Sequence, residues 1–286
     1  MNDLPPSSLI GGRYEVVSLL GRGGQSTVYR ARDRVDGDEV AIKVVHGAAG
    51  DPDAMERIFR EAQSLTQLMG TSAVRILHQV RTDDGGFALV MELLEGKDLE
   101  VTLAEIEARG ARLSLPAFEQ MFGPIVATLE QAHALGLVHR DLKAENVFVV
   151  DPSRGGGVRL IDFGFVKMVR APSITATEAI AGSPAYIAPE VFLQGATVAD
   201  ARVDVYSLAV VQYRALAGEL PFDGESLIDV MRAVTRGARP SLYARRPELS
   251  PNVDGWVEIA LAIHPEERFQ SVSASWNALR ACFPRG

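Results

Sequence analysis

The sequence predicts an α+β fold of two lobes, a small β-rich lobe with one main helix and a larger, mostly helical lobe. Turn-bounded runs of β-branched residues dominate up to about residue 94, and helical periodicity dominates after it. The composition, 47% hydrophobic and 23% charged over 286 residues, is typical of a globular enzyme with a sizeable core. We expect a flexible lead-in at 1–12 and lobes at 13–94 and 95–286.

The small lobe is predicted from its turn signals. Gly21–Gly24 and Asp36–Gly37 separate three strands, and Asp83–Gly86 joins two more. A helix is expected to begin at Asp51–Pro52, because proline suits the first helical position and apolar residues then recur at helical spacing up to Leu68. The predicted strands are 13–20, 27–32, 39–45, 74–81 and 87–93.

The large lobe is predicted mainly from apolar stripes. A helix is expected over 115–135, kinked or split by Gly123–Pro124. Residues 147–150 and 158–161 flank a turn and predict a hairpin. The apolar stretch 203–218 is interrupted by charges and is too short to span a bilayer, so we expect a buried helix there.

Charge and cysteine content exclude several classes of protein. The net charge of −8 argues against nucleic acid as the main partner, because binding a phosphate backbone requires a surplus of lysine and arginine. The single cysteine, Cys282, permits neither an intramolecular disulfide nor a cysteine-based zinc site. The first residues carry no signal-peptide pattern. We therefore expect a cytoplasmic protein without a membrane span.

A glycine-rich segment lies between the first two predicted strands, over 20–28. Glycines allow backbone amides to approach phosphate oxygens without obstruction by side chains. The segment opens onto a strand rather than a helix, which excludes a dinucleotide-binding fingerprint, and no Gly-Lys-Ser/Thr follows, which excludes a P-loop. By itself, an ordinary glycine-rich turn explains the segment equally well.

A lysine and a glutamate follow in positions suited to phosphate binding. Lys43 ends the motif Val-Ala-Ile-Lys on the strand after the glycine-rich segment. Glu61 lies near the apolar stripe of the predicted helix, where it could pair with Lys43. Solvated side chains would explain both residues as well.

The polar residues 139–146 and 162–164 favour the phosphate-binding interpretation over an ordinary turn and solvated side chains. His-Arg-Asp-Leu-Lys-Ala-Glu-Asn precedes one strand of the predicted hairpin, and Asp-Phe-Gly follows the other. The hairpin should bring Asp141, Asn146 and Asp162 to one edge. Asn146 and Asp162 would supply oxygen ligands to magnesium, and Asp141 would remain free to accept a proton.

Together with Ala188-Pro189-Glu190, these motifs resemble, in order, those of the eukaryotic-like protein kinase family, bacterial type. The resemblance covers about 14–283, nearly the whole chain. It implies one two-lobed kinase catalytic domain that transfers the γ-phosphoryl group of ATP to serine or threonine hydroxyls of proteins. It also implies an ion pair between Glu190 and Arg268.

The resemblance implies a role for each site residue. Asp141 orients and deprotonates the acceptor hydroxyl, Lys143 steadies the transferring phosphoryl group, and Asn146 and Asp162 hold Mg²⁺, for which Mn²⁺ could substitute. His139 is expected to be a packing residue rather than a base. The residues expected to bind ATP are Leu20, Gly21, Gly23, Gly24, Val28, Ala41, Lys43, Glu61, Met91, Glu92 and Leu94.

Substrate type and regulation are implied in the same way. Lys143, and Ser183 at a position that serine/threonine kinases fill with threonine, indicate a serine/threonine kinase. The segment 173–177 resembles bacterial activation loops, so Thr175 and Thr177 are expected to be autophosphorylated, and their phosphates could pair with Arg140. A homodimer would permit this reaction in trans.

Three departures from the family pattern remove no reacting group. Ser26 replaces the third glycine, Ala144 replaces a proline, and Gly123–Pro124 interrupts a helix that is continuous in the family. The alternative of a pseudokinase scaffold is disfavoured by the retained Lys43 and Asp141. A small-molecule kinase of the aminoglycoside type is disfavoured by the intact segment 182–190.

Overall fold

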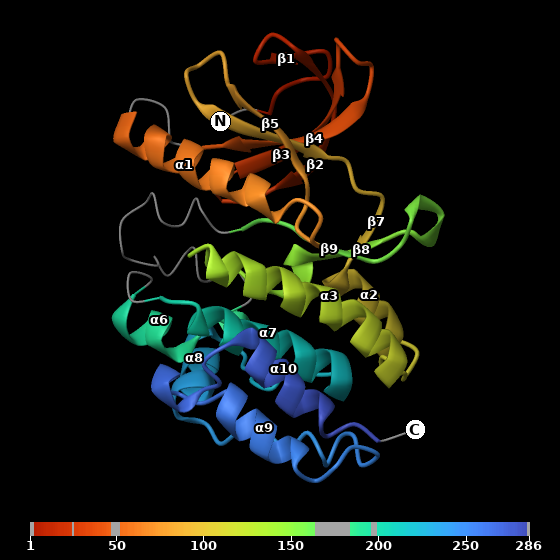
Figure 1. Cartoon of the computed structure of the whole chain (residues 1–286), viewed down its shortest axis with the longest axis vertical. Helices are drawn as coiled ribbons and strands as arrows, with labels where there is room; N and C mark the ends of the chain where they lie inside the picture. Colours follow the sequence, from red (N-terminus) through yellow and green to blue (C-terminus); the bar gives the residue numbers. More distant parts are fainter. Residues whose placement is uncertain (1–2, 25, 47–51, 164–183, 196–198, 285–286) are drawn as a thin grey trace. The chain divides into compact units, whose positions relative to one another are not determined.

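The computed structural model describes residues 3–24, 26–46, 52–163, 184–195 and 199–284, except for the side chains of 52–55, 57, 58 and 61. The chain forms two compact units. Glu95 is the last described residue of the first unit, and Gly96 is the first residue of the second. Each unit is described by itself below. Figure 1 labels the helices and strands.

The first unit is built on a six-stranded antiparallel sheet with the strand order β1-β2-β3-β4-β6-β5. Most strand bounds lie within two residues of the predicted ones. Hairpin turns at left-handed glycines, Gly37 (φ 79°) and Gly85 (φ 79°), join consecutive strands. The strands are β1 Leu9–Ile10, β2 Tyr14–Arg22, β3 Ser26–Asp33, β4 Glu39–Val45, β5 Ile76–Arg81 and β6 Phe87–Glu92.

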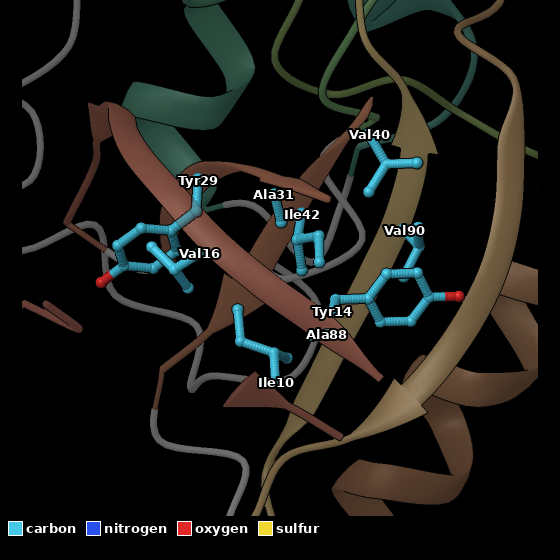
Figure 2. Packing of buried hydrophobic residues seen from close by; sticks show 9 residues of the cluster. All are labelled: Ile10, Tyr14, Val16, Tyr29, Ala31, Val40, Ile42, Ala88 and Val90. Carbon is cyan, nitrogen blue, oxygen red and sulfur yellow. The ribbon is translucent and has the colours of Figure 1, made fainter. Parts of the chain in front are cut away.

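One face of this sheet is closed by a hydrophobic cluster (Figure 2). Tyr14 and Ile42 are fully buried in it. Because side chains alternate between the faces of a strand, the alternate residues of β4 and β6 belong to the opposite face. The cluster consists of Ile10, Tyr14, Val16, Tyr29, Ala31, Val40, Ile42, Ala88 and Val90.

The expected helix is α1, Pro52–Leu65, followed by a short 3-10 turn at Thr66–Leu68. It contacts the sheet through Phe59, whose ring lies edge-on to Phe87 with 4.8 Å between the ring centroids. Phe87 alternates with Ala88, which belongs to the cluster, so α1 lies on the face opposite the cluster. Lys43 is on this same face, because it is directly opposite Leu89 in the register.

Part of the expected lead-in is ordered instead. Leu9 and Ile10 form β1, which pairs with Glu15 and Tyr14 of β2. Ile10 is 2% exposed and belongs to the cluster, so burial of its side chain favours the added strand. Two residues are too short to produce a recognisable alternation in a sequence.

The second unit is mostly helical. Serine and aspartate side chains cap several helix starts: Asp98 accepts from the amide of Val101, and Ser271 accepts from that of Ala274. The helices are α2 Leu99–Glu107, α3 Leu115–Ala134, α6 Pro189–Gln194, α7 Arg202–Ala217, α8 Leu227–Arg236, α9 Val253–Ala260 and α10 Val272–Arg280.

Helix α7 is the predicted buried helix. All of its residues from Val203 to Ala217 are buried, and it ends at Gly218, which adopts the left-handed conformation with φ 78°. Helices α3, α7 and α10 pack together (Figure 1), and Phe118 of α3 stacks on Trp276 of α10 at 5.8 Å. No helix within the described ranges is both long and apolar enough to cross a membrane.

A three-stranded sheet, β7-β8-β9, completes this unit. It contains the predicted hairpin as β8 Val147–Val150 and β9 Val158–Leu160, and adds β7 Gly96–Asp98, which the sequence analysis missed. Gly96 has φ 147°, and a Cβ atom there would collide with the carbonyl oxygen of Val149. Glycine is therefore required where β7 meets β8.

The expectation that Gly123–Pro124 splits the long helix in two is wrong. Helix α3 runs without interruption through Pro124, so Gly123–Pro124 is no departure from a continuous helix. The proline removes one amide donor, but the neighbouring Phe122 and Ile125 are fully buried. Tertiary packing of the apolar stripe outweighs the local cost.

Candidate functional site

In the first unit, the glycine-rich segment forms the hairpin between β2 and β3. Gly21 is paired with Val28, and the amide of Gly23 donates to the carbonyl of Ser26 at 2.8 Å. Neither Gly21 nor Gly24 has a positive φ, and a Cβ atom at either would meet nothing described within 4 Å. Folding of the described hairpin therefore does not require glycine here, whereas close approach of a phosphate does.

Predicted nucleotide-binding residues share one face of the sheet. Val28 is directly opposite Lys43, and Ala41 is directly opposite Met91. Directly paired residues of antiparallel strands project to the same side, so these four occupy the face opposite the hydrophobic cluster. Lys43 is only 6% exposed. It is therefore not a solvated residue at the end of a strand, which was the alternative interpretation. Leu20, half exposed, lies at the hairpin.

For three further predicted residues of this unit, the structure gives the position in the fold but not the predicted contact. Glu61 is on α1, on the same face of the sheet as Lys43, but its side chain lies outside the described part, so the ion pair with Lys43 stays a prediction. The amide of Glu92 donates to the carbonyl of Arg75 at 3.0 Å, so a bond from Glu92 to adenine would have to use its carbonyl oxygen. Leu94 follows two residues after β6 ends.

In the second unit, Asp204 of α7 holds the loop that contains Asp141. Its Oδ2 accepts from the amide of His139 at 2.7 Å, and its Oδ1 accepts from the amide of Arg140 at 2.9 Å. Nε2 of His133 lies 2.8 Å from Oδ2. Asp204 is fully buried, so these partners compensate the large cost of burying a carboxylate.

Asp141 and Asn146 are in direct contact. Nδ2 of Asn146 donates to the backbone carbonyl of Asp141 at 2.6 Å and to its carboxylate Oδ2 at 3.1 Å. The same carboxylate oxygen lies 4.0 Å from Nζ of Lys143. The structure thus brings together the two predicted catalytic residues and one predicted metal ligand.

Asn146 comes directly before β8, and Asp162 comes two residues after β9, the strand that pairs with β8. The amide of Ile161 donates to the carbonyl of Asn146 at 2.9 Å, which extends the β8–β9 pairing to the residue before Asp162. Asn146 is therefore paired with Ile161, and Asp162 is the next residue along the chain. That its carboxylate lies close to the side chain of Asn146 stays a prediction. Oxygen ligands from these two side chains suit magnesium.

His139 is a packing residue. It is fully buried, its ring lies 4.5 Å from that of Phe163, and Nε2 lies 3.2 Å from the carbonyl of Ile161. The amide of Asp141 donates to Nδ1 at 3.4 Å, so Nε2 carries the proton. Burial lowers the pKa of His139, which favours this neutral form.

Two residues of this site have strained backbones. Arg140 (φ 60°) and Asp162 (φ 59°) adopt the left-handed conformation, which is uncommon for residues other than glycine. Such strain persists only where the surroundings enforce it and is concentrated at functional sites. Asp204 constrains the backbone of Arg140, because its carboxylate accepts a hydrogen bond from the Arg140 amide.

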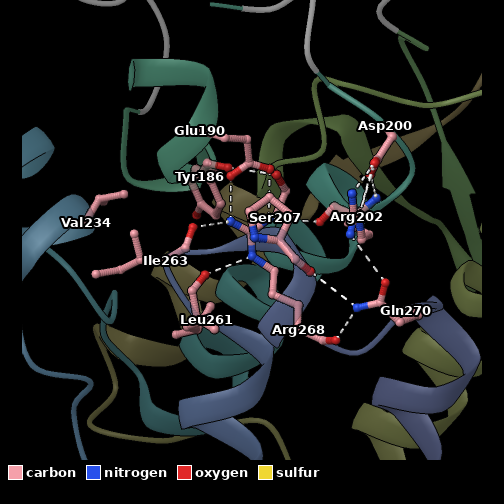
Figure 3. Close-up of polar contacts among 12 residues, drawn as sticks. Tyr186, Glu190, Asp200, Arg202, Ser207, Val234, Leu261, Ile263, Arg268 and Gln270 are labelled. Atoms are coloured by element: carbon pink, nitrogen blue, oxygen red, sulfur yellow. Dashed lines mark hydrogen bonds and ion pairs between the residues drawn. The ribbon is translucent and has the colours of Figure 1, made fainter. Parts of the chain in front are cut away.

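The predicted ion pair between Glu190 and Arg268 is confirmed (Figure 3). Two guanidinium nitrogens donate to the two carboxylate oxygens at 2.8 and 2.5 Å, and both side chains are buried. Further donors of Arg268 reach the carbonyls of Ala262, Arg202 and Ile263. This network fixes the start of α6 to the segment after α9.

The contacts by which Asp204 and His133 support the loop of Asp141 were not predicted from the sequence. A carboxylate within an otherwise apolar helix was the available signal, because a buried charge must have partners. Within the described residues, no group of three or more histidine, cysteine or acidic side chains could hold a metal ion by itself. Gly164, Thr175, Thr177 and Ser183 lie outside the described residues.

Comparisons with known proteins agree with this geometry. The model of the family "Protein kinase domain" matches residues 14–276. Serine/threonine-protein kinase PknL of Mycobacterium tuberculosis is 37% identical over 277 residues, which cover 96% of this chain and 67% of PknL. The probable serine/threonine-protein kinase PknB of Corynebacterium glutamicum is 33% identical, covering 93% of this chain and 41% of PknB.

A solved structure is similar over almost its full length. The crystal structure of the PknI kinase domain of Mycobacterium tuberculosis superposes with a TM-score of 0.73 at 26% identity, covering 98% of this chain and 99% of that one. The chain therefore belongs to the protein kinase family and has the protein kinase fold. Within that family it is a serine/threonine-protein kinase, which acts on protein substrates.

Proposed function

We propose that this kinase domain uses Mg–ATP and that its site residues have the roles expected from the family motifs. The observation that carries the proposal is the contact of Asn146 with Asp141, with Lys143 4.0 Å from the same carboxylate. ATP would be bound by Leu20, Gly21, Gly23, Gly24, Val28, Ala41, Lys43, Glu61, Met91, Glu92 and Leu94.

The donor set fits a magnesium ion. Nδ2 of Asn146 is used by Asp141, which leaves Oδ1, an acceptor, as the atom for a cation. Asp162 adds a carboxylate, and magnesium typically takes its remaining ligands from phosphate and water. When bound, the ion would neutralise negative charge on the nucleotide phosphates. Mn²⁺ prefers similar oxygen ligands.

Asp141 is the group proposed to receive the proton. The acceptor hydroxyl of a serine or threonine would donate to its carboxylate, and the oxygen would then bond to the γ-phosphorus as the bond from γ-phosphorus to the bridging oxygen of ADP breaks. The contact with Asn146 orients the carboxylate. Lys143 would offset negative charge on the transferring phosphoryl group.

Labelled ATP and Mg²⁺ test this proposal. Transfer to protein should fall by about 10²–10⁴-fold in the Asp141→Asn variant, because a general base is lost. Asp83→Asn, in the exposed turn after β5, is the matched control and should leave transfer unchanged. Undiminished transfer by Asp141→Asn would refute the assigned role, whereas no transfer by the wild type would favour a pseudokinase scaffold.

Thr175 and Thr177 are proposed as autophosphorylation sites that act through Arg140. Nε of Arg140 is buried without a hydrogen-bond partner among the described residues, which supports a guanidinium able to take an added anion. Mass spectrometry after incubation with ATP should find phosphate on these threonines and none in Asp141→Asn. Unchanged activity of the double alanine variant, with no phosphate found in this segment, would refute the proposal.

Three expectations from the sequence stay predictions: a homodimer for phosphorylation in trans, a cytoplasmic location, and no nucleic acid as a partner. Analytical ultracentrifugation at several protein concentrations tests the first. Cell fractionation tests the second. Binding to labelled DNA and RNA over a range of salt concentrations tests the third.

A further inference from the structure

Arg214 of α7 is a buried cation that no step of the proposed mechanism uses. It is 8% exposed and lies within a helix that is buried from Val203 to Ala217. Its guanidinium reaches two other elements of the second unit, the helix α2 and the turn Pro184–Tyr186. A buried charge of this kind must be compensated by specific partners.

Two partners are carboxylates of α2. One terminal nitrogen of Arg214 donates to Glu100, while Nε and the other terminal nitrogen donate to the two oxygens of Glu107 at 3.3 and 3.4 Å. Burial would lower the pKa of Arg214, but the hydrogen bonds to Glu100, Glu107 and Tyr186 together raise it. The guanidinium is therefore a permanent charge that joins α7 to α2.

The third partner is Tyr186. The nitrogen that serves Glu100 also lies 3.2 Å from the Tyr186 hydroxyl. At the other end of the same residue, the Tyr186 carbonyl accepts from the hydroxyl of Ser207 at 2.7 Å (Figure 3). Ser207 and Arg214 are seven residues apart, two turns along one face of α7, so a single helix face holds both the backbone and the side chain of Tyr186.

Tyr186 is 3% exposed, and burial raises its pKa to about 12. The hydrogen bond with Arg214 opposes this rise in pKa, and the negative charges of Glu100 and Glu145 add to it. Glu145 belongs to the turn Ala144–Asn146, against which α2 packs. Arg214 thus connects the Pro184–Tyr186 turn with α2, which packs against the turn Ala144–Asn146 of the catalytic loop.

We propose that Arg214 is a positioning residue for protein substrate, holding the Pro184–Tyr186 turn and α2 in one arrangement beside the catalytic loop. The inference rests on the proposed role of Asp141, because a substrate hydroxyl must be delivered to that carboxylate. Arg214 touches no reacting group in this proposal. Its loss should weaken use of peptide substrate more than it alters reaction of the nucleotide.

Steady-state kinetics separate this role from a merely structural one. The probe is a degenerate peptide library with a fixed central serine or threonine, and ATP hydrolysis without peptide is measured in parallel. For Arg214→Met, kcat/KM for peptide should fall on the order of tenfold, the effect of losing charge-assisted hydrogen bonds. KM for ATP and the hydrolysis rate should change less than about twofold, because no contact with nucleotide is removed.

Two further variants keep the test decisive if Arg214→Met does not fold. Tyr186→Phe removes only the hydroxyl that accepts from Arg214 and should show the same split, to a smaller extent. Arg214→Lys keeps the charge but lacks the planar guanidinium that donates to Glu100, Glu107 and Tyr186. Its kcat/KM for peptide should therefore lie between those of Arg214→Met and the wild type. Arg245→Met, which breaks the half-exposed pair with Glu219, is the control and should behave like the wild type.

The outcomes distinguish this inference from the proposed function. Equal losses in peptide transfer and ATP hydrolysis, or an unchanged kcat/KM for peptide in Tyr186→Phe, would overturn the positioning role. An active Asp141→Asn would overturn the assignment of the base while leaving the Arg214 measurements interpretable. A peptide-specific loss in both Arg214→Met and Tyr186→Phe supports the inference.

Discussion

The carboxylate of Asp204 lies 2.7 Å from the backbone amide of His139, a residue 65 positions earlier in the chain. A buried helix therefore holds the loop that contains Asp141 by its backbone rather than by a side chain. Because the contact is made by a backbone amide, any residue except proline at position 139 could donate it. The acceptor, by contrast, cannot be changed without leaving buried donors unpaired.

Asp204→Asn should separate this support from the chemistry. An asparagine keeps one acceptor oxygen but turns an NH₂ group toward a backbone donor, so we expect a loss of about 2–4 kcal/mol in the free energy of unfolding. Transfer of labelled phosphate should fall even under conditions where the variant remains folded. Urea denaturation and kinase assays measure the two effects, and wild-type values in both would contradict the role of Asp204.

Asn146→Asp should inactivate the enzyme by charge alone. The new carboxylate would lie about 3 Å from that of Asp141, a distance at which two carboxylates do not both ionise readily. We expect transfer to fall by about 10²-fold or more. Asn277→Asp, an exposed change on α10, is the control and should leave transfer unchanged. An active Asn146→Asp would mean that the contact is not needed.

Arg268→Met should be among the most destabilising single changes. It leaves Glu190 as an unpaired buried carboxylate, which costs about 3–5 kcal/mol of unfolding free energy. Adding Glu190→Leu should restore part of the loss, because the isolated charge is removed. The exposed pair of Arg245 and Glu219 provides the control, for which Arg245→Met should cost less than about 1 kcal/mol. Chemical denaturation of the four proteins checks this order.

Asp33 should contribute a pH-dependent part of the stability. Its hydrogen bonds with Arg13, at 2.6–3.0 Å, lower the pKa of Asp33 from 3.8 to about 2. A lowered folded-state pKa stabilises above the unfolded value, and the stabilisation is lost as pH falls from 3.8 toward about 2.

The difference in Tm between the wild type and Asp33→Asn should therefore be largest above pH 3.8 and shrink below it. Asp36→Asn is the control, because Asp36 pairs with the same arginine from an exposed position and should show a smaller difference. A Tm difference that stays constant down to pH 2 would contradict the assignment.

Several elements could be predicted because their signals are local. The strand Glu39–Val45 coincides with its predicted bounds, since four of its seven residues are β-branched and a turn precedes them. The continuity of α3 through Pro124 could not be predicted, because the neighbouring Phe122 and Ile125 are buried by partners distant in the sequence. β1 was missed for the same reason: Ile10 forms a strand only because β2 is present to pair with it.

The sequence by itself determined which reacting groups are present, because the motifs around Lys43, Asp141 and Asp162 depend on residue type and spacing along the chain. Only the tertiary structure decided which distant residues hold the loop of Asp141 and the elements around α7. The contacts of Asp204 with His139 and of Arg214 with Tyr186 and Glu100 join segments many residues apart. The physical reason is that a buried charge must find its partners in space, and its position in the chain does not specify which residues folding will bring to it.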